Sequence, residues 1–188
     1  MSAKSIGELL RDRVPRHGDG PAFHAAKDGT WSSTSWRDFD RRVRALGLAL
    51  DAAGLKRGDS IAIMADTREE WTTVDAAAMA VGLLVVGIYH SNLPDSVEYI
   101  LKDCDAKAIF VEDKRQLDKV EQIKANVPTL RAIYGIQADG VPSGGKSFAD
   151  LVKEGEWILA KDAKKWDALV DAVKPSDLAT LVYTSGTT

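Results

Sequence analysis

Two stretches of small and hydroxylated residues have the composition of phosphate-binding loops. The first is residues 140–147, Gly-Val-Pro-Ser-Gly-Gly-Lys-Ser, and the second is the run Thr184, Ser185, Gly186, Thr187 and Thr188. Both stretches can present backbone N–H groups and hydroxyl groups to the oxygens of a polyphosphate, and the first adds a lysine ammonium.

The first stretch matches the full spacing of a Walker A loop, but three features argue against nucleotide binding there. The segment 137–139 separates it from the preceding apolar run, whereas a P-loop leaves its strand directly. Pro142 removes one backbone N–H from a device that works by presenting such groups. No later apolar run ends in an acidic residue that would hold Mg²⁺. We therefore predict a surface loop that binds no nucleotide, and a P-loop NTPase or nucleotide-binding module using Gly140 to Ser147 is the alternative.

The second stretch directly follows an apolar run, residues 178–183, that we predict to be a buried strand. Ligands of α/β proteins bind at the carboxyl ends of parallel strands, and Gly186 allows a close approach of the backbone. By composition alone, a turn rich in Thr and Ser after a strand is more often only a turn.

The elements that would position these loops follow from the hydrophobic pattern. Apolar runs recur about every two dozen residues with helical patterns between most of them, which is typical of βαβ units. The predicted strands are 61–64, 83–88, 108–111, 130–136 and 178–183. Because these runs are continuous, both faces of the sheet should be covered. The predicted fold class is α/β, with a mostly parallel sheet and helices on both faces.

Local signals refine this prediction. Asp28-Gly29 indicates a hairpin between 22–26 and 30–36, and Gly54 should end a helix. The predicted helix starts lie at Ser35, at Asp66 or Thr67, at Pro94 and at Ser147. The helix after Ser147 should be short and run through Leu151, and a second should span 161–173.

Composition limits the functional classes. The chain has 188 residues, a net charge of −3 and a single cysteine, Cys104. The charge gives no attraction to nucleic acid, and one cysteine favours a reducing compartment, so we expect a cytoplasmic protein. Cys104 follows apolar residues at helical spacing and is expected to be a packed residue. No apolar stretch is long enough for a membrane span, which needs about 20 residues.

The order of residues in the second stretch is more specific than its composition. The segment 177–188, Asp-Leu-Ala-Thr-Leu-Val-Tyr-Thr-Ser-Gly-Thr-Thr, resembles the signature of the adenylate-forming (AMP-binding) superfamily, Tyr-Thr-Ser-Gly-Thr-Thr-Gly-x-Pro-Lys. Segments 31–39, 54–63 and 81–113 resemble earlier parts of the same family. Within it, 87–92, Gly-Ile-Tyr-His-Ser-Asn, is most similar to long-chain acyl-CoA synthetases.

The resemblance implies a two-step reaction. A fatty acid carboxylate attacks the α-phosphate of ATP and expels pyrophosphate, and the thiol of CoA then attacks the acyl adenylate. It implies ATP, Mg²⁺ and CoA as cofactors or cosubstrates and a fatty acid as the substrate. It is also compatible with a homodimer and with peripheral contact with a membrane. By the same resemblance, Thr184, Ser185, Gly186, Thr187 and Thr188 would hold the phosphates of ATP. His90, after a predicted strand end, is a candidate for a pocket wall, although a structural histidine is the commoner case.

The chain departs from the family pattern by ending inside this motif. Residues 1–188 are expected to be the N-terminal portion of the large ATP/AMP-binding domain, truncated inside the phosphate-binding loop. The motif lysine, the adenine-binding motif, the Mg²⁺-binding glutamate and the catalytic lysine would lie beyond Thr188, so no catalytic residue or metal ligand is assigned. A non-catalytic α/β scaffold is the remaining alternative.

Overall fold

A computed structural model describes residues 4–27 and 29–184 of the chain. The described helices are α1 (Ile6–His17), α2 (Trp36–Ala52), α3 (Glu69–Ala80), α4 (Pro94–Asp103), α5 (Lys114–Ile123), α6 (Phe148–Lys161) and α7 (Ala163–Asp171), with 3₁₀ turns η1 (Lys124–Asn126) and η2 (Ala138–Gly140). The described strands are β1 (Pro21–Lys27), β2 (Thr30–Ser35), β3 (Ser60–Met64), β4 (Leu84–Gly87), β5 (Ala106–Val111), β6 (Ala132–Gly135), β7 (Lys146–Ser147) and β8 (Thr180–Leu181).

The body of the molecule is a six-stranded sheet in the order β7-β6-β5-β3-β4-β8. Every neighbouring pair in this sheet is parallel. The strand β3 lies inside it and is buried along its whole length. The predicted α/β class with a parallel sheet is therefore confirmed.

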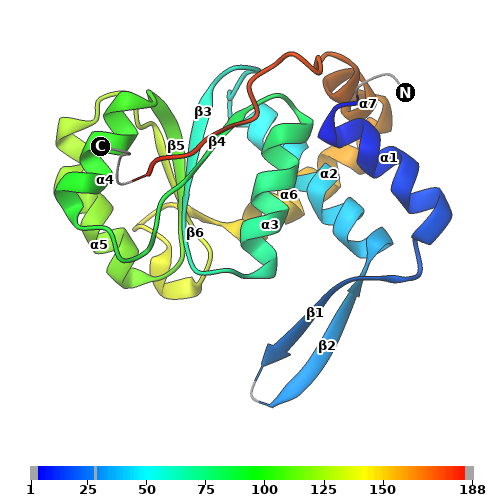
Figure 1. The fold of residues 1–188 in the computed structure, drawn as a ribbon, viewed down its shortest axis with the longest axis horizontal. Helices are drawn as coiled ribbons and strands as arrows, with labels where there is room; N and C mark the ends of the chain where they lie inside the picture. Colours follow the sequence, from blue (N-terminus) through cyan, green and yellow to red (C-terminus); the bar gives the residue numbers. More distant parts are fainter. Residues whose placement is uncertain (1–3, 28, 185–188) are drawn as a thin grey trace.

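Helices cover both faces of this sheet, as the continuous apolar runs predict. Along β3, Ile61 and Ile63 point into a core shared with α2, α3 and α6, whereas Ala62 and Met64 point into a second core shared with α4 and α5. Figure 1 shows these two helical layers on opposite sides of the strands. A strand buried on both faces needs apolar residues at consecutive positions, which explains the absence of alternation.

The connections create a switch point in the sheet. From β3 the chain passes through α3 on one face to the neighbouring strand β4. From β4 it returns through α4 on the other face and crosses β3 to reach β5. The segments that leave the carboxyl ends of β3 and β4 therefore diverge to opposite faces, and such a divergence opens a crevice where α/β proteins bind ligands.

Three of the four predicted helix starts are confirmed. Ser35 Oγ accepts the N–H of Asp38, Ser147 begins α6 with a capping box, and α4 begins at Pro94. The predicted cap at Asp66 or Thr67 is wrong, because α3 begins later, after Arg68, without a side-chain cap. Asp66 is instead used in contacts between loops, described below.

Two further predictions need correction. The run 178–183 contains only a two-residue strand, β8, at the edge of the sheet, and Leu178 and Val182 are 72% and 78% exposed. The prediction of a buried strand over 178–183 is therefore wrong for the described residues. It failed because an apolar run looks the same in sequence whether the strand lies at the edge of a sheet or in its interior. The helix after Ser147 continues to Lys161, far beyond Leu151, and the next helix, α7, is shorter than predicted.

The predicted hairpin is present as the antiparallel pair β1–β2. Figure 1 shows it projecting from the body of the molecule. Gly54, with φ of 89°, follows the end of α2, as predicted for a residue that ends a helix in the left-handed region. No helix within 4–27 or 29–184 is long and apolar enough to cross a membrane.

Asp75 on α3 carries a testable pH dependence. Partial burial raises the pKa of this carboxyl from 3.8 to about 6. The folded state therefore keeps a proton that the unfolded state has lost, and the free energy of unfolding falls as pH rises between about 4 and 6. We expect Asp75→Asn to remove this dependence and to stabilise the protein at neutral pH by about 1 kcal/mol, a value reduced for solvent screening. Urea unfolding of the parent protein and of Asp75→Asn at the two ends of this pH range measures the difference in unfolding free energy. The prediction is contradicted if this free energy changes with pH equally in both proteins.

Candidate functional site

A cavity of about 500 Å³ occupies the crevice between the carboxyl ends of β3 and β4. We call it the switch-point cavity. Its walls come from the segment after β3, from β4 with the segment after it, and from residues 180–183. The topology thus produces a hollow at the position where the sequence predicts ligand binding.

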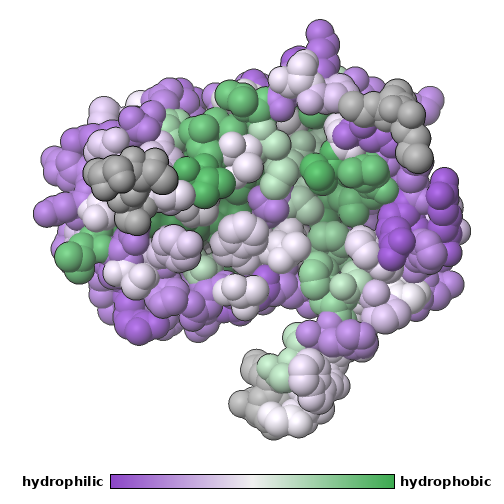
Figure 2. All heavy atoms as spheres, viewed as in Figure 1, coloured by the Kyte–Doolittle hydropathy of each residue, from purple (hydrophilic) through white to green (hydrophobic). Residues whose placement is uncertain are grey.

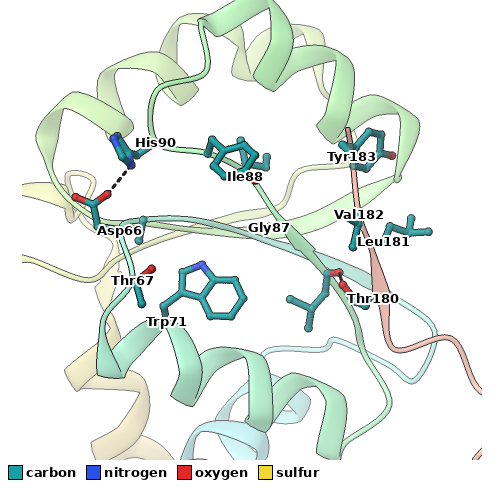
Figure 3. Close-up of a pocket in the computed structure, with 13 residues that line it drawn as sticks. Asp66, Thr67, Trp71, Gly87, Ile88, His90, Thr180, Leu181, Val182 and Tyr183 are labelled. Atoms are coloured by element: carbon teal, nitrogen blue, oxygen red, sulfur yellow. Dashed lines mark hydrogen bonds and ion pairs between the residues drawn. The ribbon is translucent and has the colours of Figure 1, made fainter. Parts of the chain in front are cut away.

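The switch-point cavity has an apolar interior and a polar rim. Trp71 and Ile88 contribute apolar surface, and Asp66, Thr67 and His90 contribute polar groups. His90 Nδ1 lies 2.5 Å from Asp66 Oδ1, so the pair links the segments after β3 and β4. Figure 3 shows this pair on one side of the cavity and Tyr183 on the other. The sequence-based candidate His90 therefore does line a cavity.

The crevice on the other side of β3 is closed by charged groups. Glu112, at the end of β5, accepts the N–H of Asp66 at 2.7 Å and a bond from Arg68 Nη1 at 3.0 Å. Arg68 also binds Glu70, and Gln137 Nε2 donates to Glu112 at 3.2 Å. These contacts fix the segment after β3, and they leave the β3–β4 side as the open one.

A lysine fixes the segment after β4. Lys119 Nζ, from α5, donates to the carbonyl oxygens of His90 at 2.6 Å and Asn92 at 2.9 Å. Both loops of the switch-point cavity are therefore held by the β5–α5 unit, through Glu112 and Lys119. Loops fixed in this way form a pocket before a ligand arrives, which lowers the entropic cost of binding.

The segment leading to the Thr/Ser-rich run is attached to the sheet beside β4. Arg57 binds Asp177 through two bonds of 2.7 and 2.9 Å and lowers the pKa of that carboxyl to about 2. Thr180 Oγ1 donates to the carbonyl of Val85 at 2.9 Å. The chain then continues to Thr184, which lines a second cavity of about 800 Å³, here called the outer cavity. Ser185, Gly186, Thr187 and Thr188 lie outside the described residues.

Some of these residues are not apparent from the sequence pattern. Asp66 is predicted to start a helix and Trp71 is assigned no role in a site, but both line the switch-point cavity. The available signal for Asp66 is its position directly after a buried strand, at the edge where ligands bind. Cys104 is buried, and burial raises the pKa of its thiol, which agrees with the predicted packed residue.

Comparison with known proteins decides the family. The family model described as AMP-binding enzyme matches residues 10–188 of the chain. The chain belongs to the AMP-binding enzyme family.

Relatives in this family include long-chain fatty acid–CoA ligases. The chain is 32% identical over 161 residues to long-chain-fatty-acid–CoA ligase FadD15 of Mycobacterium bovis, covering 86% of the chain and 26% of that protein. It is 29% identical over 188 residues to long-chain-fatty-acid–CoA ligase ACSBG1 of Bos taurus, covering 100% of the chain and 26% of that protein. The chain thus spans about a quarter of the length of these curated relatives.

Solved structures agree on the fold. A long-chain-fatty-acid–CoA ligase, FadD1, from Archaeoglobus fulgidus superimposes with a TM-score of 0.78 at 16% identity, covering 100% of the chain and 35% of that structure. The anthranilate CoA ligase AuaEII, solved with anthranoyl-AMP, gives a TM-score of 0.72 at 26% identity, covering 80% of the chain and 28% of that structure. The predicted resemblance to adenylate-forming enzymes is confirmed.

The Walker-like loop of this AMP-binding family member is engaged in its own hydrogen bonds. The N–H groups of Gly140 and Gly145 donate to nearby carbonyls, and the N–H of Ser147 donates to the carboxylate of Asp150. Lys146 Nζ lies 2.5 Å from Glu154, which raises the pKa of the lysine. A phosphate would have to displace these partners and approach the Asp150 carboxylate, which is electrostatically unfavourable.

We therefore expect Lys146→Ala to leave ATP-dependent adenylation nearly unchanged in an enzyme that contains these residues. The lost Lys146–Glu154 pair is exposed and should cost less than about 1 kcal/mol of stability. Steady-state kinetics with ATP as the varied substrate is the measurement. A loss of about a hundredfold in kcat/KM would instead support the P-loop alternative.

Proposed function

We propose that residues 1–188 are the N-terminal part of the large domain of an AMP-forming fatty acyl-CoA ligase. The sequence signature at 177–188 and the family match support this proposal. Long-chain fatty acids are the proposed substrate class, because relatives along the whole chain carry that name. ATP and CoA are the proposed cosubstrates.

The observation that carries the proposal is the path of the chain through β8. This strand runs parallel to β4, so Thr184 emerges at the carboxyl edge of the sheet, beside the switch-point cavity. We propose that Thr184, Ser185, Gly186, Thr187 and Thr188 bind the β- and γ-phosphates of ATP. Their hydroxyl and N–H groups would stabilise the negative charge that moves onto pyrophosphate as the fatty acid carboxylate attacks the α-phosphate. The CoA thiol then displaces AMP from the acyl adenylate.

Mg²⁺ is implied by the family resemblance, but the described residues offer no site for it. In 4–27 and 29–184 there is no group of three or more His, Cys, Asp or Glu side chains that could hold a metal ion. The carboxylates of Asp66 and Glu112 are bound to His90 and Arg68 instead. We therefore assign no step to Mg²⁺ through these residues.

Product analysis tests the proposal. A purified enzyme containing these residues is incubated with ATP, Mg²⁺, CoA and carboxylic acids of increasing chain length. The expected products are AMP and pyrophosphate, in amounts that depend on a long-chain fatty acid. Formation of ADP and phosphate would favour the P-loop alternative, and no nucleotide turnover with any acid would favour a non-catalytic scaffold.

A further inference from the structure

The strand β8 is too short to fix the direction of the chain that follows it. Only Thr180 and Leu181 pair with β4, at the exposed edge of the sheet. A two-residue ladder leaves the next residues free to rotate unless side chains hold them. The segment 177–184 is therefore expected to depend on side-chain contacts for its position.

One such contact lies immediately before Thr184. Tyr183 packs against the core between the sheet and α4 and lines both the switch-point cavity and the outer cavity. Its Oη donates to Asp103 Oδ2 at 2.5 Å, across 80 residues of sequence. Figure 3 shows Tyr183 at the end of the 180–183 segment, turned toward α4.

The partner of Tyr183 occupies an unfavourable place in its helix. Asp103 is the last residue of α4, where the partial negative charge of the helix end repels a carboxylate. Among the described residues no lysine, arginine or histidine forms an ion pair with Asp103. A hydrogen bond from Tyr183 therefore stabilises a charge that the helix itself disfavours.

We propose that Asp103 is a positioning residue for the adenylation reaction, acting through Tyr183 on the phosphate-binding segment. This inference rests on the proposed function. The bond fixes the Tyr183 side chain against α4, and the backbone of Tyr183 sets the point from which Thr184 begins. Arg57 and Asp177 hold the other end of the segment, so Asp103 and Tyr183 hold the end nearer to the proposed phosphate site.

The kinetic test uses a ligase that contains these residues, with the variants Asp103→Ala, Tyr183→Phe and the double variant. Each single change is expected to lower kcat by about threefold to tenfold, the range for one solvent-accessible hydrogen bond. The KM for the fatty acid should stay within about a factor of two, because the acid is not held by this bond. The double variant should lose no more than either single variant.

Asp171→Ala is the matched control. Asp171 is likewise an aspartate at the last position of its helix, α7, and it pairs with Arg11 far from the cavities. Its removal should leave kcat unchanged. If Asp103→Ala and Tyr183→Phe are as active as Asp171→Ala, the positioning role is wrong. If the unsubstituted enzyme makes no adenylate, the proposed function fails instead, and the two failures are distinct.

A second measurement detects the bond without catalysis. Burial and the hydrogen bond to Asp103 raise the pKa of the Tyr183 phenol. Burial also raises the pKa of the Tyr134 phenol, so two phenols should ionise late in an alkaline titration of the 188-residue chain followed by ultraviolet absorbance. Asp103→Ala should shift only the Tyr183 phenol to lower pH, and Tyr183→Phe should remove that phenol and leave the late ionisation of Tyr134. A titration that Asp103→Ala leaves unchanged would show that the bond is absent and would overturn the proposal.

Discussion

Replacing Gly155 by alanine is expected to destabilise the protein by about 3 kcal/mol or more. Gly155 lies in α6 where this helix crosses α2. An added Cβ would lie 1.7 Å from the carbonyl oxygen of Ala45 and 2.3 Å from its carbonyl carbon. These are backbone atoms of α2, so no rotamer change relieves the clash and the two helices must separate. Alanine is the better helix former by about 1 kcal/mol, so the expected loss opposes intrinsic propensity.

The control is the same substitution at another buried helical glycine. At Gly47 in α2, an added Cβ first meets side-chain atoms, Trp166 at 2.7 Å and Val81 at 3.0 Å. Side chains can shift, so Gly47→Ala should cost less than Gly155→Ala. Ala45→Gly should not rescue Gly155→Ala, because the clash involves the backbone of Ala45. Urea unfolding ranks the variants, and a Gly155→Ala protein as stable as the parent would contradict the observed packing of α2 and α6.

The central strands could be predicted because their requirement is simple. A parallel strand covered on both faces needs consecutive apolar residues, and 61–64, 83–88 and 108–111 supply them. The run 178–183 looks the same in sequence but lies at an edge, where Leu178 and Val182 are exposed. The rest of the fold decides whether a neighbouring strand covers an apolar run, and the sequence of the run alone does not show it.

The prediction of helix boundaries failed where tertiary contacts competed with local sequence signals. Asp66 has the residue type of a cap, but its N–H is bound by Glu112 and its carboxylate by His90. Those partners are distant in sequence, so no local pattern predicts them.

The candidate site was predictable only in part for the same reason. The edge of the sheet that carries it follows from the positions of the strand ends. The contact between Tyr183 and Asp103 joins two distant segments and could not be predicted.

The 188-residue polypeptide alone is expected to release no pyrophosphate from ATP. Adenylation depends on positioning and on electrostatic stabilisation of the leaving phosphates, and a partial set of contacts loses most of both. The matched part of the chain covers only 26% of the length of each of these curated relatives. Among the described residues, Thr184 is the only member of the proposed phosphate-binding segment, and it is exposed.

The surface around β8 should also make the isolated polypeptide associate with itself. Leu178 and Val182 are largely exposed on this segment, and Figure 2 shows apolar side chains on the face that carries it. An uncovered apolar edge favours pairing with another copy, so we expect dimers or aggregates of the isolated polypeptide at high concentration. Light scattering measures this association.

A pyrophosphate-release assay with ATP, Mg²⁺ and a long-chain fatty acid measures turnover by the isolated polypeptide, with a longer enzyme as the positive control. Turnover by the 188-residue polypeptide above a no-enzyme blank would show that its own residues suffice for adenylation, and the proposed division of the site between these residues and a longer chain would then be wrong.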